Sequence, residues 1–296
     1  MAKSYRTKNT AFDWVNLALT LGMMAVMVYP LWYIVVGAFN EGVDYMRGGV
    51  YFWPRQFTLD NFRAVFVNPA ILNAFLITIA KCVVATAGTL LVTGLASYAI
   101  IRPQLRFKKF YLGYIMFTMF FGGGLIPFFV LITQLRLYDT FWVYVLPNLF
   151  GAYNMVIMQS FMRDISPSLI ESAKIDGAGE YRVFFQIILP LSKPVMATIA
   201  LFSIVGHWNG YFDAMMYTHS AWLETIQLYL KKVITDPSAR GGLGGTASTV
   251  PGQMIKTTPQ SVKLATMVVT ALPIIVVYPF LQRYFVKGMT LGAVKG

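Results

Sequence analysis

The side chains best suited to binding a polar ligand lie close together in one short segment of the chain. Residues 207–213 hold an imidazole, an indole, an amide, a phenol and a carboxylate among apolar neighbours. Asn209 and Asp213 are four positions apart, so on a helix they would share a face from which both could hydrogen-bond to hydroxyl groups. An aromatic ring beside them could stack on the apolar face of a pyranose. The fourth apolar run, 140–162, contains further polar candidates in Asn148, Tyr153 and Asn154. The path residues predicted from both segments are Tyr153, Asn154, His207, Trp208, Asn209, Tyr211 and Asp213.

Each of these residues also has a plainer explanation. An aromatic side chain in an apolar helix can serve core packing or an interfacial belt, and an asparagine can make an interhelical hydrogen bond. Taken singly, each residue is better explained in this way. Their concentration in one segment is what supports the binding hypothesis.

The sequence carries none of the motifs that would indicate an enzyme. The only histidines are His207 and His219, and no Ser/His/Asp or metal-ligand constellation is apparent. The single cysteine, Cys82, can form neither a disulfide nor a cysteine zinc site within the chain. No Gly-x-x-x-x-Gly-Lys-[Ser/Thr] phosphate loop occurs. We therefore expect no metal, no cofactor and no ATP hydrolysis in this chain, and any energy must come from a partner.

Apolar helices must position these residues. The chain has 296 residues, of which 57% are hydrophobic and 12% charged, whereas a soluble domain carries about a quarter charged residues. Runs of low charge reach the roughly 20 residues that cross a bilayer as a helix, and no period-two alternation typical of a barrel is visible. The predicted fold is an all-α membrane protein with six transmembrane helices, at about 14–40, 71–101, 110–135, 140–162, 190–213 and 262–284.

The distribution of Lys and Arg predicts the orientation. The amino-terminal tail, with Lys3, Arg6 and Lys8, the 102–109 loop and the carboxyl tail are basic and free of acids. These segments are expected in the cytoplasm of a bacterium, which places both termini inside a multi-pass inner-membrane protein. The formal net charge of +12 then reflects topology, and we expect no nucleic-acid partner.

Two connections are too long to be simple turns, and long ordered loops tend to be functional. In the inner loop, 163–193, Ser166 could cap a short helix that has Pro167 at its first position, and Gly177 stands where a left-handed residue would end it. Its acidic residues argue against a helix lying on lipid and favour docking to another protein. The outer loop, 214–263, contains a Gly/Ser/Thr stretch from Gly241 to Gly252, expected to be mobile and to face a partner outside; a solvated linker is the alternative.

The inner loop also carries a specific pattern. It reads Glu-Ser-Ala-Lys-Ile-Asp-Gly over 171–177, then nine residues, then Ile-Ile-Leu-Pro over 187–190. This closely resembles the signature of permease subunits of binding-protein-dependent ABC importers, Glu-Ala-Ala, three residues, Gly, nine residues, Ile-x-Leu-Pro. Ser172 is the one departure, small for small. Residues 121–127, 175–178, 189–194 and 206–209 resemble the carbohydrate branch, in particular its oligosaccharide subgroup that includes alginate-type permeases.

The resemblance implies a type I ABC importer permease fold in which the inner loop is a coupling helix held in a cleft of a cytoplasmic ATPase. It implies a second permease subunit, commonly a different chain, two cytoplasmic ATPase subunits that bind ATP and Mg, and an extracytoplasmic sugar-binding protein facing the outer loop. The ATPase-coupling residues would be Leu169, Glu171, Ser172, Ala173, Asp176 and Gly177.

Two other classes of protein would also have many apolar helices. A stand-alone secondary transporter driven by an ion gradient would need an ionisable relay within the membrane. Lys81 is the only charge well inside an apolar stretch, and we expect it to reach the outer interface by snorkelling rather than to serve in a relay. A membrane-embedded enzyme is disfavoured because the sequence shows no catalytic constellation.

Overall fold

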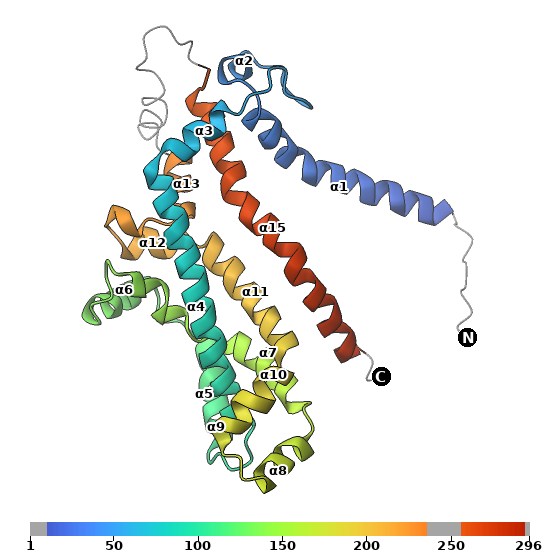
Figure 1. Ribbon diagram of the computed structural model, residues 1–296, viewed down its shortest axis with the longest axis vertical. Helices are drawn as coiled ribbons and strands as arrows, with labels where there is room; N and C mark the ends of the chain where they lie inside the picture. The colour runs from blue at the N-terminus through green and yellow to red at the C-terminus, as the bar shows by residue number, and fades with distance from the viewer. Residues whose placement is uncertain (1–10, 236–255, 294–296) are drawn as a thin grey trace. The chain divides into compact units, whose positions relative to one another are not determined.

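The computed structural model describes residues 11–235 and 256–293, and helices joined by turns and loops make up this part of the chain (Figure 1). It contains no β-strand within those ranges, only an isolated bridge between Asn40 and Phe57. The expected all-α fold is confirmed. Lys3, Arg6 and Lys8 of the amino-terminal tail and the 241–252 stretch of the outer loop lie outside the described residues.

Three helices of the described ranges are long and apolar enough to cross a bilayer without a break. They are α1 (Ala11–Ala38), α4 (Pro69–Ile101) and the Pro259–Val277 part of α15 (Pro259–Ala293). Large apolar side chains on α1, such as Phe12, Leu19 and Val26, are exposed. Such a surface is stable against lipid or another protein but not against water.

Three further candidates are helix pairs bent at a short break, so the count of spans is three, or up to six if each pair is one span. Helices α5 (Lys108–Phe120) and α6 (Leu125–Gln134) meet at 114°. The break consists of Phe121 and three glycines, and Gly124 has a φ of 84°, which glycine adopts at no steric cost. The predicted span at 110–135 is therefore two helices pointing in different directions.

The other two pairs are bent less sharply. Two short 3₁₀ turns, η1 (Phe141–Tyr144) and η2 (Leu146–Asn148), precede α7 (Ala152–Arg163) at 49°. The segment Glu180–Leu191, formed by α9 (Glu180–Val183), a π-helical turn (Phe184–Ile188) and α10 (Leu189–Leu191), meets α11 (Lys193–Asn209) at 79°. The depth of each helix in a bilayer, and with it the predicted span limits, stays a prediction.

By its contacts the chain divides into two compact units. The first comprises residues 1–68 and 233–270 and includes α1, α2 (Gly42–Met46) and α3 (Asp60–Val67). Its centre is the buried amide of Asn61, which donates to the carbonyls of Ala38 and Asn40 and accepts a hydrogen bond of 2.7 Å from Ser261. This unit is thus closed by polar contacts between segments about 200 residues apart.

The second unit comprises residues 69–232 and 271–296, and α4 lies at its centre, against α7 and α11 (Figure 1). Two apolar clusters form its core, one around Tyr144 and Tyr217 and the other around Met158, Phe184 and Ile199. Both of the predicted functional regions belong to this unit.

Helix α4 carries a buried row of small polar side chains at helical spacing, at positions 78, 82, 86, 89, 93 and 97. Thr86 donates to Ser203 of α11 at 3.0 Å, Thr89 to the carbonyl of Asn148 at 3.1 Å, and Ser97 to the carbonyl of Met155 at 3.2 Å. Small polar residues let helices approach closely and hydrogen-bond within lipid. The row therefore fixes α4 against its neighbours along most of its length.

The part of the outer loop after α11 folds onto this core. It forms α12 (Phe212–Tyr217), η4 (Ala221–Leu223) and α13 (Ile226–Thr235). The hydroxyl of Tyr144 donates to the carbonyl of Leu223 at 2.7 Å, and the amide of Ile226 donates to Thr78 at 2.9 Å. Up to α13 this loop is ordered structure rather than a linker.

Candidate functional sites

The first candidate site is helix α8 (Pro167–Ile175), which corresponds to the predicted docking helix. Pro167 starts the helix as expected, but the Ser166 side chain does not cap it; the Ser166 hydroxyl pairs with that of Ser168 at 2.8 Å. The helix therefore begins without a side-chain cap, and the fixed φ of Pro167 favours its start.

The end of α8 follows the sequence prediction. Gly177 has a φ of 79°, its amide donates to the carbonyl of Lys174 at 3.0 Å, and the amide of Ala178 reaches back to Ala173 at 2.9 Å. This pair of bonds is the Schellman pattern, with glycine at the left-handed position. No atom lies within 4 Å of the place where a Cβ would stand on Gly177, so the backbone angle alone requires glycine there.

The predicted coupling residues divide between two faces of α8. Ala173, with Ile170, packs against the apolar cluster around Met158 and Phe184. Leu169, Glu171, Ser172 and Asp176 are exposed, and beside them Ile175 is 87% exposed. An exposed face of leucine, isoleucine and acidic side chains is complementary to a groove that is apolar with a basic rim. Ala173 lies on the opposite, packed side of α8 and is not part of the exposed face.

The second candidate site is a cavity of about 360 Å³ between α4, α7 and α11, closed on one side by the start of α12. Its volume lies at the lower end of the range of about 300–1,000 Å³ for ligand pockets. The wall combines hydroxyl, amide, imidazole, carboxylate and aromatic groups: Thr89, Asn148, Phe150, Gly151, Asn154, Phe202, Ser203, Gly206, His207 and Asp213. Hydrogen-bonding groups beside flat rings are what binding a sugar requires.

Three of the seven predicted path residues line this cavity, namely Asn154, His207 and Asp213. Trp208 is buried and lies against the ring of Phe75, with 6.1 Å between ring centroids. Tyr211 lies under the ammonium of Lys231, 4.6 Å from the ring centroid. Tyr153 and Asn209 are exposed and are not part of the cavity wall. The structure therefore divides the predicted set, because successive residues of a helix point in different directions.

Sequence reasoning missed several wall residues, among them Thr89, Phe150, Phe202 and Ser203. One signal for them was available. Thr89 belongs to the polar row of α4, and a polar row with helical spacing in an apolar span indicates a face turned toward protein rather than lipid. Phe150 and Phe202 give no such signal, because an apolar aromatic residue suits lipid equally well.

The snorkelling interpretation of Lys81 is wrong. Its side chain is fully buried, and Nζ donates to the carbonyl of Gly210 at 3.2 Å and stands 4.9 Å from the centroid of the Tyr144 ring. Gly210 directly follows α11, so the ammonium also faces the negative end of that helix. Asp213, on the cavity wall, adds a favourable charge interaction. Lys81 holds the break between α11 and α12 beside the cavity.

In the described residues the protein combines bent apolar helices, an exposed helix in a loop and a polar cavity between α4, α7 and α11. The comparisons with known proteins show the class to which it belongs. Residues 23–291 match the family described as binding-protein-dependent transport system inner membrane component. The chain belongs to this family.

Relatives align over almost the whole chain. Protein LplC of Bacillus subtilis is 36% identical over 302 residues, covering all of both chains. The polygalacturonan/rhamnogalacturonan transport system permease protein YtcP of the same organism is 34% identical, covering 98% of this chain and all of the relative. A solved chain of a bacterial ABC transporter that imports the acidic polysaccharide alginate superposes with a TM-score of 0.87 at 29% identity, covering 96% of this chain and 99% of that one. The type I permease fold is thereby confirmed.

Proposed function

We propose that this chain is one permease subunit of an ATP-driven importer that moves a sugar, in particular an oligosaccharide, across the bacterial inner membrane. The observation that carries the proposal is the cavity wall of amide, hydroxyl, carboxylate and aromatic groups between α4, α7 and α11. The names of the relatives, which include transport proteins for polygalacturonan and alginate, point to the same class of substrate. An ion-coupled transporter is disfavoured because Lys81 is fixed to a backbone carbonyl.

The energy and the sugar would both arrive through partners. Two cytoplasmic ATPase subunits would bind ATP and Mg and receive the exposed face of α8, which carries Leu169, Glu171 and Asp176. An extracytoplasmic binding protein would deliver the sugar at the outer loop, and a second permease subunit, a different chain, would complete the path. Both termini would face the cytoplasm.

The cavity is tested by a pair of asparagine variants in the reconstituted importer. Asn154→Leu removes an amide from the cavity wall while nearly preserving volume, and Asn209→Leu makes the same change at an exposed position outside it. Loss of one hydrogen bond to the sugar is expected to lower the transport rate about tenfold in Asn154→Leu. Uptake of labelled oligosaccharide into proteoliposomes, with ATPase content measured alongside, is the readout.

Asn209→Leu should transport like the wild type. Equal rates in Asn154→Leu and the wild type would contradict a sugar site in this cavity. A loss confined to Asn209→Leu would instead place the path on the exposed side of α11.

A further inference from the structure

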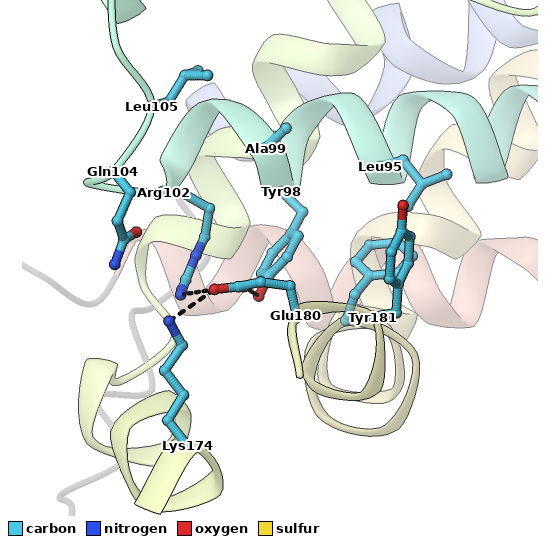
Figure 2. Close-up of a pocket in the computed structure, with 10 residues that line it drawn as sticks. Leu95, Tyr98, Ala99, Arg102, Gln104, Leu105, Lys174, Glu180 and Tyr181 are labelled. Carbon is cyan, nitrogen blue, oxygen red and sulfur yellow. Dashed lines mark hydrogen bonds and ion pairs between the residues drawn. The ribbon is translucent and has the colours of Figure 1, made fainter. Parts of the chain in front are cut away.

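The carboxylate of Glu180 makes polar contacts between the loop that contains α8 and the end of α4, beside apolar contacts such as that of Tyr98 with Phe184, 5.4 Å between ring centroids. Glu180, the first residue of α9, accepts hydrogen bonds at Oε1 from Lys174 Nζ at 2.7 Å and from Arg102 Nη2 at 3.0 Å. Its Oε2 accepts the hydroxyl of Tyr98 at 2.6 Å. Figure 2 shows the three donors converging on this one group from two separate helices. We call these four residues, Glu180, Lys174, Arg102 and Tyr98, the Glu180 clasp.

Each donor of the clasp comes from a defined place in the fold. Lys174 stands in the last turn of α8, whereas Tyr98 lies in the last turn of α4 and Arg102 directly follows it. The Arg102 guanidinium also stacks over the Tyr98 ring, 5.2 Å from the ring centroid. The clasp therefore binds the end of the exposed helix to the end of the central helix.

The clasp keeps its charge at every physiological pH. Hydrogen bonds from Lys174 and then Tyr98 lower the pKa of Glu180 to about 2, and Arg102 adds to the effect. The Arg102 side chain is 13% exposed and Tyr98 is buried, so two of the four groups are largely shielded from water and salt. The Glu180 and Lys174 side chains are 50% and 36% exposed, so their ion pair is weaker than the shielded contacts that Tyr98 and Arg102 make with the same carboxylate.

The other end of this connection lies at the cavity. Helix α4 runs without interruption through Thr89, which lines the cavity, to Tyr98 nine residues later. At 1.5 Å per residue these positions are about 14 Å apart along one rigid helix. A displacement of α8 that pulled on Glu180 would therefore act on a helix that also forms the cavity wall.

We propose that Glu180 is a positioning residue that couples movement of α8 to movement of the α4 wall of the cavity. The inference rests on the proposed function, in which an ATPase moves α8. Its alternative is that the clasp merely keeps the loop folded. Both roles need the positive charge of Lys174, but loss of coupling lowers the sugar transported per ATP in a complex that still assembles, whereas loss of folding lowers assembly.

The test is chemical restoration of that charge in the complete importer. Lys174→Cys removes the ammonium, and the only natural cysteine of this chain, Cys82, is buried, while any cysteines of the partner subunits react equally in the control variant. The purified variant complex is treated before reconstitution with 2-aminoethyl methanethiosulfonate, which attaches an ammonium, or with methyl methanethiosulfonate, which attaches a neutral group. Sugar transported per ATP hydrolysed is then measured. Lys109→Cys, an exposed lysine with no ion pair among the described residues, is the matched control.

The expected result is a loss of about fivefold in sugar transported per ATP, at the lower end of typical coupling energies, in Lys174→Cys. The aminoethyl reagent should restore the ratio and the neutral reagent should not, while Lys109→Cys stays at the wild-type ratio throughout. Equal restoration by both reagents, or an unchanged ratio in untreated Lys174→Cys, would overturn the inference.

A second variant decides the matter if Lys174→Cys does not assemble. Tyr98→Phe keeps the ring and removes only the hydroxyl that Oε2 accepts. It should also lower sugar transported per ATP, and a wild-type ratio in Tyr98→Phe would overturn the inference. Failure of the proposed function looks different, because the wild-type complex itself would then show no ATP-dependent uptake.

Discussion

At the level of single residues, the polar side chains of the second unit either hydrogen-bond to neighbouring segments or line the cavity. Thr86, Ser97 and Lys81 satisfy partners on neighbouring helices. Asn154 and Asp213 instead present hydrogen-bonding groups to the cavity. In a bilayer, unsatisfied polar groups are costly, so polar groups on a cavity wall need water, a ligand or a charged side chain such as Lys81 as a partner.

Gly88 of α4 lies close to the side chain of Leu149. A Cβ at this position would collide with Leu149, whose neighbours Asn148 and Phe150 line the cavity. Gly88→Ala is expected to destabilise the purified chain by about 0.5–1.5 kcal/mol because the Leu149 side chain must leave its present rotamer. Thermal unfolding in detergent measures the change.

Gly113→Ala is the matched control, because nothing lies within 4 Å of its Cβ position on α5 and alanine is the better helix former. It should leave the chain as stable as before or slightly more stable. An equal loss in both variants would show that the space beside Gly88 is not what limits substitution.

Much of the candidate site could be predicted from the sequence, and the rest could not for a definite reason. Asn154, His207 and Asp213 were found because they are polar residues in apolar runs. Trp208 was expected on the same path, but its side chain points to Phe75. The cavity wall is assembled from four segments, and only the packing of α4 against α7 and α11 decides which side of each segment meets the others.

At the level of elements, α8 ends where its sequence predicts, and this gives a prediction about coupling. Gly177→Val forces a β-branched residue into the left-handed region, at a cost of about 1–2 kcal/mol or more. Glu171→Lys reverses a charge on the exposed face without touching the backbone. Both variants should insert in the membrane yet lose sugar uptake, measured in cells together with membrane content.

The two variants are expected to fail for different reasons. Glu171→Lys should no longer retain the ATPase through purification, whereas Gly177→Asn, which tolerates a positive φ better than valine, should recover part of the activity lost in Gly177→Val. Normal uptake in both Glu171→Lys and Gly177→Val would contradict the assignment of α8 as the coupling helix.

The 218–220 segment is held in place by the carboxylate of Asp139, which lies in the turn after α6. Asp139 accepts hydrogen bonds from the amides of His219 and Ser220, both at 2.8 Å, and from the Ser220 hydroxyl at 2.6 Å. The Ser220 hydroxyl and amide, with the His219 amide, lower the pKa of Asp139 from 3.8 to about 2. The charged form therefore fastens the 218–220 segment to the turn after α6.

Because of this contact, the stability of the folded chain should decrease as the pH falls. Because the folded pKa is the lower one, the stabilisation is fully present above about pH 4 and is lost as the pH falls toward 2. Asp139→Ala should lower the melting temperature in detergent at pH 7, and the difference from the wild type should shrink below pH 4. A difference that stays constant down to pH 3 would contradict the role of the charge.

The positions of the helix breaks could not be obtained from apolar runs. Hydropathy reports how polar a segment is and contains no information on the direction of its axis. The run at 110–135 is uniformly apolar, yet it turns by 114° at its glycines. The run at 140–162 contains Pro147, which lies in a 3₁₀ turn before the bend to α7. Glycine and proline mark where a break can occur, and packing selects the angle.

At the level of the whole molecule, the orientation in the membrane is open to a direct measurement. Ala221→Cys lies in the outer loop and Ser168→Cys in α8, and both positions are exposed. A membrane-impermeant maleimide should label Ala221→Cys in intact spheroplasts and Ser168→Cys only in inverted vesicles. The reverse pattern would invert the topology predicted from Lys and Arg.

The burial of Lys81 also has a consequence for membrane insertion while the chain is being synthesised. Its acceptor, the carbonyl of Gly210, lies 129 residues further along the sequence. At a synthesis rate of about 5–20 residues per second, α4 leaves the ribosome roughly 6–26 seconds before that carbonyl exists. Placing an unpaired lysine at the centre of a span costs about 2.5–3.5 kcal/mol on insertion scales. During this interval the unpaired lysine makes transfer of α4 into lipid unfavourable. We therefore expect α4 to leave the insertion machinery only after α11 has been made.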